Sequence, residues 1–263
     1  MLKLCVTGSG ISYTLSPVIH KAVLGAMGVE AEYGVEDIPA DKFAAAAPRL
    51  ISSYDGFNVT KPFKRDIIPF LSSLETGELD AVNAVKVCGG RAVGYNTDAE
   101  GFMLSLEQLT GDVCGADVLV IGAGGAAEAA VYALAGRGAS VTVYNRTYSK
   151  AAALAAKAGV RAVERASDAG RAEIFVNCAT PPAPALPSGA DTSALKFAYD
   201  LVYSPAHTPF MAACEDAGAK TSNGLGMLIY QAIIADEIFS GRSGNRAELA
   251  RAAMLAVNKE NGR

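Results

Sequence analysis

The sequence predicts an α/β protein of two domains, the second of them a doubly wound parallel sheet. The chain has 263 residues, which at ~150 residues per domain corresponds to between one and two domains. Short apolar runs alternate with helical patterns along most of the chain, as strands and helices do in α/β proteins. From about residue 98 the helical stretches become rich in alanine and separate short strand-like runs, which indicates a parallel sheet and a domain boundary.

The first strand and the first helix are predicted from the amino-terminal residues. An apolar run at residues 2–6 indicates a strand. Ser16 suits the N-cap of a helix and Pro17 its first position, since proline fixes a helical φ and no N–H is needed there. Apolar residues recur at helical spacing up to Gly28, a residue type that commonly ends helices.

The rest of the first half alternates in the same way and ends in a hairpin. Two apolar runs flank Cys88-Gly89-Gly90, and paired glycines favour the tight turns that join antiparallel strands. In chain order, the expected elements are a strand at 31–36, an Ala-rich helix at 40–51, a strand at 55–59, a helix from Pro62 to about Leu71, and strands at 81–87 and 91–96.

The second half is expected to begin with a helix and to continue with parallel strands. Its elements are a helix at 98–109, strands at 118–122, 140–144, 173–179 and 197–201 separated by helices, a long helix from about Gly224 to 239, and an amphipathic helix at 245–258. The last two helices follow the final strand, so we expect them to return to the first domain. We predict one domain from residues 1–98 and 225–263, and another from residues 99–224.

Composition and charge exclude several classes of protein. Lys and Arg number 23 against 27 Asp and Glu, a net charge of −4, whereas nucleic-acid-binding proteins normally present a basic face. The five cysteines form no CxxC pair and stand beside only two histidines, so neither a zinc site nor a disulfide framework is expected. The N-terminus lacks a signal-peptide pattern, and the apolar stretch 118–135 contains Glu128 and changes period midway. We expect a soluble cytoplasmic protein, monomeric or homodimeric, with no metal, nucleic-acid or membrane partner.

A glycine-rich loop directly follows the first strand of the second domain and opens a helix. The pattern G-x-G-x-x-A is matched by the run Gly122-Ala123-Gly124-Gly125-Ala126-Ala127. In this pattern one glycine makes a tight turn, the next lets a pyrophosphate approach the backbone, and the small last residue lets the helix pack closely on the strand. The start of the helix supplies N–H donors to the phosphates. With a strand before the loop and a helix after it, a dinucleotide site is favoured over a plain packing turn.

The segment after the next strand indicates which dinucleotide is bound. An Asp or Glu at this point binds the 2′-hydroxyl of NAD. The chain instead has Asn145-Arg146-Thr147, followed by Lys150, and two cations suit the 2′-phosphate of NADP. The alternative is that Asn145 or Thr147 only caps the next helix and that the cations are solvated. We predict NADP as the cofactor.

Further motifs occur in a fixed order along almost the whole chain. They are TLSPVIH at 14–20, NVTKPFK at 58–64, NTDAEG at 96–101, NCAT at 177–180 and GLGMLIYQA at 224–232. With the glycine loop and the N-R-T segment between them, these blocks resemble those of the shikimate dehydrogenases. Because several independent blocks match in the correct order, the resemblance is specific.

This resemblance implies a two-domain enzyme with its active site in the cleft between a substrate domain and a Rossmann-type NADP domain. Similar enzymes reversibly reduce 3-dehydroshikimate to shikimate with NADPH, a step of aromatic amino-acid biosynthesis. The matching positions imply that Lys64 and Asp98 form the catalytic pair. Thr14 and Ser16 would bind the substrate carboxylate, Thr60, Asn83, Asp98 and Gln231 the ring oxygens, and Tyr203 the substrate side. Cofactor contacts would come from Gly122, Ala123, Gly124, Gly125, Ala126, Asn145, Arg146, Thr147, Lys150, Thr180, Leu201 and Gly224.

Elementary chemistry supports these roles and also offers simpler ones. Two hydroxyls at the start of a helix can donate to a carboxylate, which the helix dipole also favours. Taken alone, Lys64 would be an exposed helix lysine and Asp98 a helix N-cap. Which of the two carries the proton stays open. We expect His20 to pack in the core, His207 to lie at the surface, and Cys178 to have no catalytic role.

The sequence departs from the family pattern at positions that affect which substrate is preferred. Thr14 replaces the usual serine, and one added methyl group changes substrate preference by about 1–3 kcal/mol. Tyr13 stands where the family commonly has histidine, and Ala84 where it has threonine. The alternatives are therefore a quinate/shikimate dehydrogenase paralogue with altered preference and a non-catalytic NADP-binding sensor.

Overall fold

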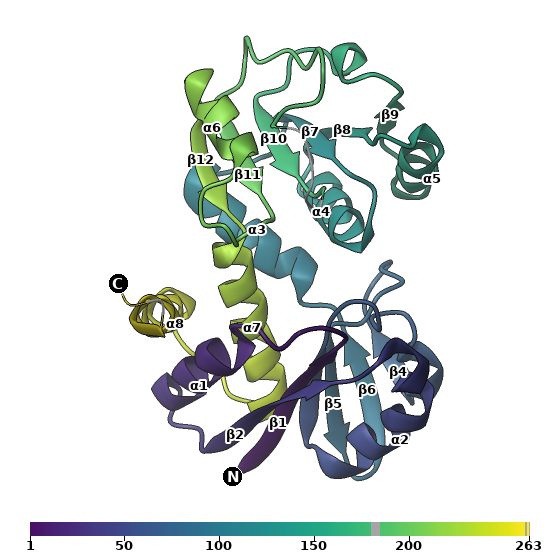
Figure 1. Cartoon of the computed structure of the whole chain (residues 1–263), viewed down its shortest axis with the longest axis vertical. Helices are drawn as coiled ribbons and strands as arrows, with labels where there is room; N and C mark the ends of the chain where they lie inside the picture. Colours follow the sequence, from purple (N-terminus) through teal and green to yellow (C-terminus); the bar gives the residue numbers. More distant parts are fainter. Residues whose placement is uncertain (180–184, 261, 263) are drawn as a thin grey trace. The chain divides into compact units, whose positions relative to one another are not determined.

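The chain folds into two compact α/β units. A computed structural model describes residues 1–179, 185–260 and 262. Unit 1 comprises Met1–Thr97 and Ile229–Arg263, and unit 2 comprises Asp98–Leu228 (Figure 1). The predicted fold class, a two-domain α/β protein with a Rossmann-type sheet, is confirmed. The assignment of substrate binding to residues 1–98 and 225–263, and of NADP binding to 99–224, stays a prediction.

The sheet of unit 1 is mixed, with the strand order β2-β1-β3-β5-β6-β4. β1 pairs in parallel with β2 and β3, β5 is antiparallel to both β3 and β6, and β4 is parallel to β6. The predicted hairpin is confirmed, since Gly89 and Gly90 join β5 to β6 with φ of 56° and 78°, as a two-residue hairpin turn requires. The strands are β1 (Leu2–Gly8), β2 (Ala31–Asp37), β3 (Gly56–Val59), β4 (Ser73–Glu75), β5 (Ala84–Cys88) and β6 (Arg91–Tyr95).

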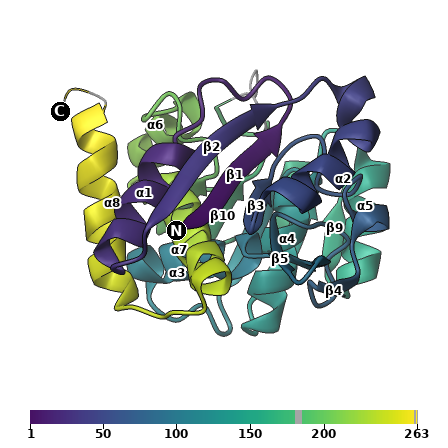
Figure 2. The same ribbon diagram turned by 90° about the horizontal axis from the view of Figure 1, so that it is seen from below.

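Helices cover both faces of this sheet, because side chains alternate along its strands. Cys5 of β1 packs in a cluster with α2, whereas its neighbours Leu4 and Val6 pack in a cluster with α1 and α7. α8 packs against α1, as both views show (Figures 1 and 2), so the predicted return of the C-terminal helices is confirmed. These helices are α1 (Ser16–Ala26), α2 (Phe43–Ser53), α7 (Leu225–Ser240) and α8 (Arg246–Glu260).

The sheet of unit 2 is parallel throughout, with the strand order β12-β11-β10-β7-β8-β9. The chain proceeds outward from β7 in one direction and then returns to β10 to proceed in the other. Ligands of such sheets bind at the carboxyl ends of the strands where this reversal occurs. The strands are β7 (Asp117–Ile121), β8 (Ser140–Tyr144), β9 (Arg161–Val163), β10 (Ile174–Asn177), β11 (Phe197–Asp200) and β12 (Lys220–Asn223).

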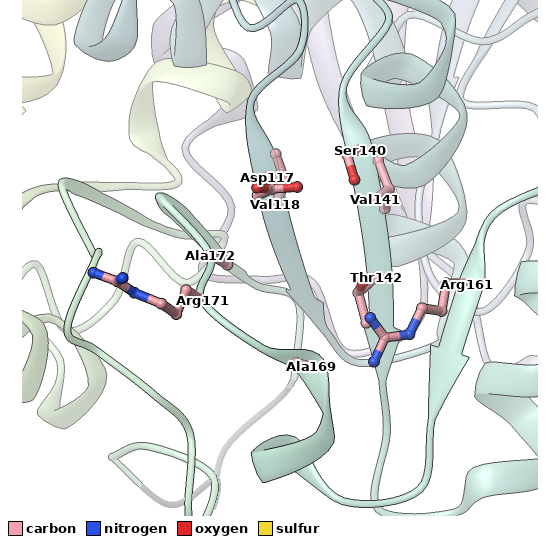
Figure 3. Close-up of a pocket in the computed structure, with 9 residues that line it drawn as sticks. All are labelled: Asp117, Val118, Ser140, Val141, Thr142, Arg161, Ala169, Arg171 and Ala172. Carbon is pink, nitrogen blue, oxygen red and sulfur yellow. The ribbon is translucent and has the colours of Figure 1, made fainter.

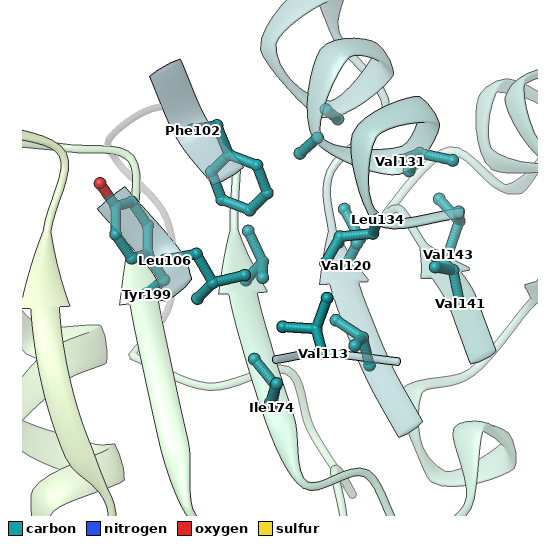
Figure 4. Packing of buried hydrophobic residues seen from close by; sticks show 14 of the residues in the cluster. Phe102, Leu106, Val113, Val120, Val131, Leu134, Val141, Val143, Ile174 and Tyr199 are labelled. Atoms are coloured by element: carbon teal, nitrogen blue, oxygen red, sulfur yellow. The ribbon is translucent and has the colours of Figure 1, made fainter. Parts of the chain in front are cut away.

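The core of unit 2 shows the same alternation. Val118 and Val120 of β7 pack in a cluster with α3, α4 and α5, part of which Figure 4 shows, whereas Leu119 packs with α6. Tyr199 of β11 meets the ring of Phe102 edge-on at 5.5 Å, and burial raises the pKa of its phenol to about 12. The helices are α3 (Asp98–Thr110), α4 (Gly125–Gly136), α5 (Tyr148–Ala158) and α6 (Pro209–Asp216).

The predicted helix from Pro62 to Leu71 is wrong. The structure has successive turns there and a short 3₁₀ helix at Ile68–Phe70. The carbonyl of Lys64, which would accept from Ile68 in an α-helix, accepts instead from the N–H of Val82 at 2.8 Å. Pro69 has no N–H to continue a helical ladder. A tertiary hydrogen bond and a proline therefore override the apolar spacing.

Three strands were not predicted, and the apolar stretch 118–135 is not one helix. β4, β9 and β12 are three or four residues long and contain polar or exposed residues, so they lack the apolar alternation that indicates a strand. Residues 118–135 are divided between β7, the glycine loop and α4. Among the residues that the structure describes, no helix is long and apolar enough to span a membrane.

Candidate active site

The glycine loop makes the tight turn that its sequence predicts. β7 ends at Ile121 and α4 begins at Gly125, and between them Gly122 has a φ of 119°, which other residues rarely adopt. The N–H of Gly122 donates to the carbonyl of Tyr144 at 2.8 Å. A Cβ on Gly122 would stand 3.1 Å from the carbonyl carbon of Cys178. Both the backbone conformation and the approach of the chain leaving β10 therefore require glycine here.

The start of α4 is open in a way that suits a phosphate. Gly124 is its N-cap residue, in an extended conformation with φ −93° and ψ −176°. Apart from the adjoining backbone, a Cβ on Gly124 or Gly125 would meet no atom of the described residues within 4 Å. The helix therefore presents its N–H groups and positive dipole end with no side chain at these two positions to cover them. Ala127 is fully buried in the core of unit 2, where a larger side chain would push α4 off the sheet.

The segment that follows β8 places two cations at the surface. The amide of Asn145 donates to the carbonyl of Thr147 at 2.8 Å and so stabilises the turn. Thr147 is the N-cap residue of α5, but its side chain makes no capping hydrogen bond, so that simpler role for Thr147 is wrong. Arg146 and Lys150 are exposed, and an anionic ligand can reach both.

A buried hydrogen-bond network at the carboxyl ends of β10 and β11 was not predicted. Asp200, 1% exposed, accepts hydrogen bonds from the amide of Asn177 at 3.0 Å and from the hydroxyl of Thr208 at 2.6 Å. It also accepts from the N–H of Val202 at 3.0 Å. These bonds fix the segment 201–203, which carries two of the predicted site residues. The sequence could have indicated this network, because a polar residue ends each strand, Asn177 in β10 and Asp200 in β11.

Gly224 and Leu201, both predicted on the cofactor side, pack directly against each other. A Cβ on Gly224 would stand 2.1 Å from the carbonyl oxygen of Leu201, so the start of α7 approaches this segment only because residue 224 is glycine. The N–H of Gly224 also donates to the carbonyl of Val202 at 3.2 Å. Tyr203 is half-buried. Thr180 lies outside the described residues.

In unit 1, the two hydroxyls predicted to bind a carboxylate are hydrogen-bonded to each other. Thr14 Oγ1 donates to Ser16 Oγ at 3.0 Å and accepts from the N–H of Ser16 at 3.2 Å. The prediction that Ser16 is the N-cap is wrong, because α1 begins at Ser16 and Leu15 precedes it in a helical conformation. Thr14 satisfies the N–H of Ser16, as threonine does in local turns. The pair therefore lies together at the amino end of α1.

Two of the predicted ring-binding residues lie within hydrogen-bond distance of each other. Asn83 Nδ2 donates to Gln231 Oε1 at 3.3 Å and to Thr97 Oγ1 at 2.9 Å, and Asn83 Oδ1 accepts from the N–H of Thr97 at 2.7 Å. Thr97 Oγ1 also donates to the carbonyl of Gln231 at 2.9 Å. All three residues are at least nine-tenths buried. Thr97 was not singled out, although it stands beside Asp98 in the same motif.

The remaining predicted residues of unit 1 follow β3. Thr60 is half-buried, and its methyl group would stand 2.6 Å from a Cβ on Gly8, so glycine at the end of β1 makes room for it. Lys64 is half-buried in the turns after Thr60, so it is not the exposed helix lysine of the simpler interpretation. Asp98 opens α3 in unit 2 and is 7% exposed. The assignment of Lys64 and Asp98 as the catalytic pair stays a prediction.

A surface cavity of about 280 Å³ lies at the opposite end of the unit 2 strands from the glycine loop (Figure 3). It is lined by the first residues of β7, β8 and β9 and by the segment before β10. These residues are Asp117, Val118, Ser140, Val141, Thr142, Arg161, Ala169, Arg171 and Ala172. None of them belongs to the predicted site.

The two histidines lie as predicted, one in the core and one at the surface. His20 is fully buried, and His207 is exposed, with Nε2 at 2.9 Å from Glu215 Oε2. Burial, with a smaller contribution from the charge of Asp200, raises the pKa of the Cys178 thiol, which opposes a nucleophilic role.

Comparison with known proteins assigns the chain to a family. The family model described as the shikimate dehydrogenase substrate binding domain matches residues 6–85, and that described as shikimate / quinate 5-dehydrogenase matches residues 105–184. The NADP(+) shikimate dehydrogenase of Carboxydothermus hydrogenoformans is 36% identical over 255 residues, which cover 90% of this chain and 91% of that protein. The chain belongs to the shikimate dehydrogenase family.

Solved structures agree with this membership of the shikimate dehydrogenase family. The shikimate 5-dehydrogenase of Thermus thermophilus, in complex with NADP(H) and shikimate, aligns with a TM-score of 0.86 and 32% identity, covering 97% of this chain and all of that chain. The 5-ketofructose reductase of a Gluconobacter strain aligns with a TM-score of 0.80 and 27% identity, covering 96% and 98%. The fold of the shikimate dehydrogenase family therefore also occurs in a reductase named for another substrate.

Proposed function

We propose that the protein is an NADP-dependent shikimate dehydrogenase that reversibly reduces 3-dehydroshikimate to shikimate. The observation that carries this proposal is the buried cluster of Asn83, Thr97 and Gln231, in which two predicted ring-binding amides from distant parts of the chain meet. Polar groups buried in this way suit a ligand with several hydroxyls, because each can donate or accept in turn. Relatives named as NADP(+) shikimate dehydrogenases support the same activity.

The residues of unit 2 fit NADP. Gly122 shapes the turn, Gly124 and Gly125 leave the start of α4 open to the pyrophosphate, and Ala123 and Ala126 stand beside them in the loop. When bound, NADPH supplies the hydride that reduces a ketone. Residues proposed to bind its 2′-phosphate and the rest of the dinucleotide are Asn145, Arg146, Thr147, Lys150, Thr180, Leu201 and Gly224.

The other proposed residues bind the substrate and transfer the proton. Thr14 and Ser16, at the positive end of α1, donate to the substrate carboxylate. The proposed contacts to the ring oxygens come from Thr60, Asn83, Asp98 and Gln231, with Tyr203 on the substrate side. Lys64 and Asp98 hold the reacting oxygen and exchange its proton, so that ketone, hydride and proton together give the alcohol.

Steady-state oxidation of shikimate and of quinate, each with NADP and with NAD, tests the proposal on one purified sample. We expect kcat/KM to be highest for shikimate with NADP. Thr14 is the residue that favours the alternative, since its extra methyl group stands beside the carboxylate site. A preference for quinate would replace the proposed substrate, and bound NADPH without turnover of either acid would favour a sensor.

Gly124→Ala tests the proposed phosphate site without disturbing the fold. The backbone of Gly124 is in a conformation open to alanine, and within the described part of the chain the added methyl group meets no atom within 4 Å beyond its own neighbours. We expect an unchanged melting temperature but a Kd for NADPH raised by about tenfold or more, because a pyrophosphate approaches the backbone at this position. NADPH fluorescence titration measures the Kd, and an unchanged value would place the phosphates elsewhere.

Placement in the cytoplasm is also part of the proposal. It is supported by the five cysteines, all of which are free thiols, with Cys5 and Cys214 buried. Thiols persist in a reducing compartment.

A further inference from the structure

Two ionisable side chains form a buried pair that the proposed reaction does not use. His20 Nδ1 on α1 lies 2.7 Å from Asp236 Oδ1 on α7, and both side chains are 0% exposed. Both residues belong to unit 1, although 216 positions separate them in the chain. The pair therefore joins two helices that the local sequence does not bring together.

Each member of the pair shares a helix with a residue of the proposed substrate site. His20 follows Ser16 by four residues, one helical turn, so both lie on the same side of α1. Asp236 follows Gln231 by five residues on α7, which at ~100° per residue places it more than one turn further along and on a different side of the helix. A hydrogen bond between His20 and Asp236 thus sets how the carboxylate-binding end of α1 lies relative to the ring-binding amide of α7.

A second set of contacts connects the pair to the same site. The ring of His20 stacks on Tyr33 at 4.2 Å and 11°. The hydroxyl of Tyr33 donates to Asn58 Oδ1 at 2.8 Å, and Asn58 Nδ2 donates to the carbonyl of Asn83 at 3.2 Å. Asn83 in turn binds Gln231. His20 is therefore connected to Gln231 by buried contacts through the sheet and, by way of Asp236, by the backbone of α7.

The pair is costly for folding, which indicates a role other than stability. Burial, partly offset by His20, raises the pKa of Asp236, so keeping this carboxylate charged at neutral pH opposes folding. His20 Nε2 and Asp236 Oδ2 have no hydrogen-bond partner within the described part of the chain. Buried pairs of this kind stabilise a fold little more than apolar side chains of similar size would.

We propose that His20 and Asp236 are positioning residues of the substrate site, whose hydrogen bond holds Thr14 and Ser16 in register with Gln231. This inference rests on the proposed function, since it concerns the affinity for shikimate. It predicts that the hydrogen bond, and not the negative charge, is what the site requires. Unit 2 contains neither residue, so binding of NADPH does not depend on the pair.

Asp236→Ala and His20→Phe test the inference, with Asp236→Asn as the conservative variant. His20→Phe keeps the ring on Tyr33 but removes the hydrogen bond, whereas the side-chain oxygen that Asp236→Asn retains can still accept from His20. We expect Asp236→Ala and His20→Phe to raise KM for shikimate by about tenfold or more, since small misplacements of binding groups have large effects, and to change the Kd for NADPH by less than about twofold. Asp236→Asn should keep KM within about twofold of wild type.

Lys86→Met is the matched structural control. Lys86 Nζ on β5 donates to the carbonyl of Ile238 at 2.6 Å and so ties α7 to the sheet, two residues beyond Asp236. This variant should lower the melting temperature and leave KM unchanged, as any purely structural tie would. If Asp236→Ala does not fold, the double variant His20→Phe/Asp236→Asn, which lacks both the bond and the charge, should show the raised KM.

The outcomes separate the two proposals. Suppose that the wild-type enzyme oxidises shikimate and that the folded variants without the hydrogen bond have the same KM as wild type. This result would overturn the positioning role and leave the proposed function intact. An equal rise in KM for Lys86→Met would also overturn it, since α7 would then need only a firm attachment. A wild-type protein that binds NADPH but does not oxidise shikimate would overturn the proposed function and this inference with it.

Discussion

Replacing Lys64 by alanine should abolish turnover while leaving NADPH binding unchanged. Proton transfer by a positioned side chain contributes about 10²- to 10⁴-fold to a rate, so we expect kcat to fall by about 10³-fold. Every residue proposed to bind the cofactor belongs to unit 2, whereas Lys64 belongs to unit 1, so the Kd for NADPH should stay within about twofold. Stopped-flow turnover of shikimate and fluorescence titration of NADPH measure the two quantities.

Two further variants make this result specific. Lys42→Ala removes an exposed lysine of the same unit, whose side chain is 71% exposed, and should have wild-type kcat. Lys64→Arg keeps the positive charge but does not release a proton near neutral pH, so it should be nearly as inactive as Lys64→Ala if Lys64 transfers the proton. An active Lys64→Arg enzyme would assign the proton to Asp98 and leave Lys64 an electrostatic role. Turnover by Lys64→Ala above about one hundredth of wild type would contradict the pair altogether.

Local sequence patterns were sufficient to predict the fold class and most of the strands and helices. The glycine loop is read correctly because its strand, turn and helix are adjacent, and Gly122 has the positive φ that the pattern requires. The hairpin at Gly89 and Gly90 is another local decision, made by two residues that accept positive φ. In both cases the residues that determine the geometry are neighbours in the chain.

Sequence signals failed where a competing hydrogen bond, distant or local, decides the backbone structure. The segment after Pro62 has helical apolar spacing, but Val82 takes the carbonyl of Lys64 out of any helical ladder. Ser16 is a good N-cap residue, but the hydroxyl of Thr14 takes its N–H, and Ser16 becomes the first residue of the helix instead. Propensity is a weak prior, and a single well-placed hydrogen bond overrides it.

In the candidate site, too, some residues could be predicted from the sequence and others depend on tertiary contacts. Gln231 lies in a motif and Asn83 is implied by the family resemblance, but their meeting through Thr97 depends on a hydrogen bond between Thr97 and Gln231, which are 134 positions apart. Asp200 carries no motif of its own, and its three donors become visible only when β10, β11 and the segment before α6 are brought together. Motifs therefore identify the groups that meet a ligand, whereas the buried groups that hold them in place depend on tertiary contacts.

Removing the two cations after β8 should abolish most of the enzyme's preference for NADPH over NADH. Arg146 and Lys150 are exposed and lie at the start of α5, where they would pair with a 2′-phosphate that NADH lacks. Hydrogen bonds to charged groups contribute about 1.5–3 kcal/mol each, so losing both in Arg146→Ala/Lys150→Ala should raise KM for NADPH by about 100-fold or more. KM for NADH should change by less than about twofold, because a pair of solvated surface charges has little other effect.

Salt dependence distinguishes this charge effect from a loss of structure. The wild-type KM for NADPH should rise between low and high ionic strength, because exposed charges are screened over about 8–10 Å at physiological salt, and that rise should shrink in the double variant. Lys157→Ala removes a cation from the last turn of the same helix and should leave both cofactors unaffected. Equal losses for NADPH and NADH in Arg146→Ala/Lys150→Ala would mean that this segment binds the shared part of the dinucleotide, and the 2′-phosphate would then need another partner.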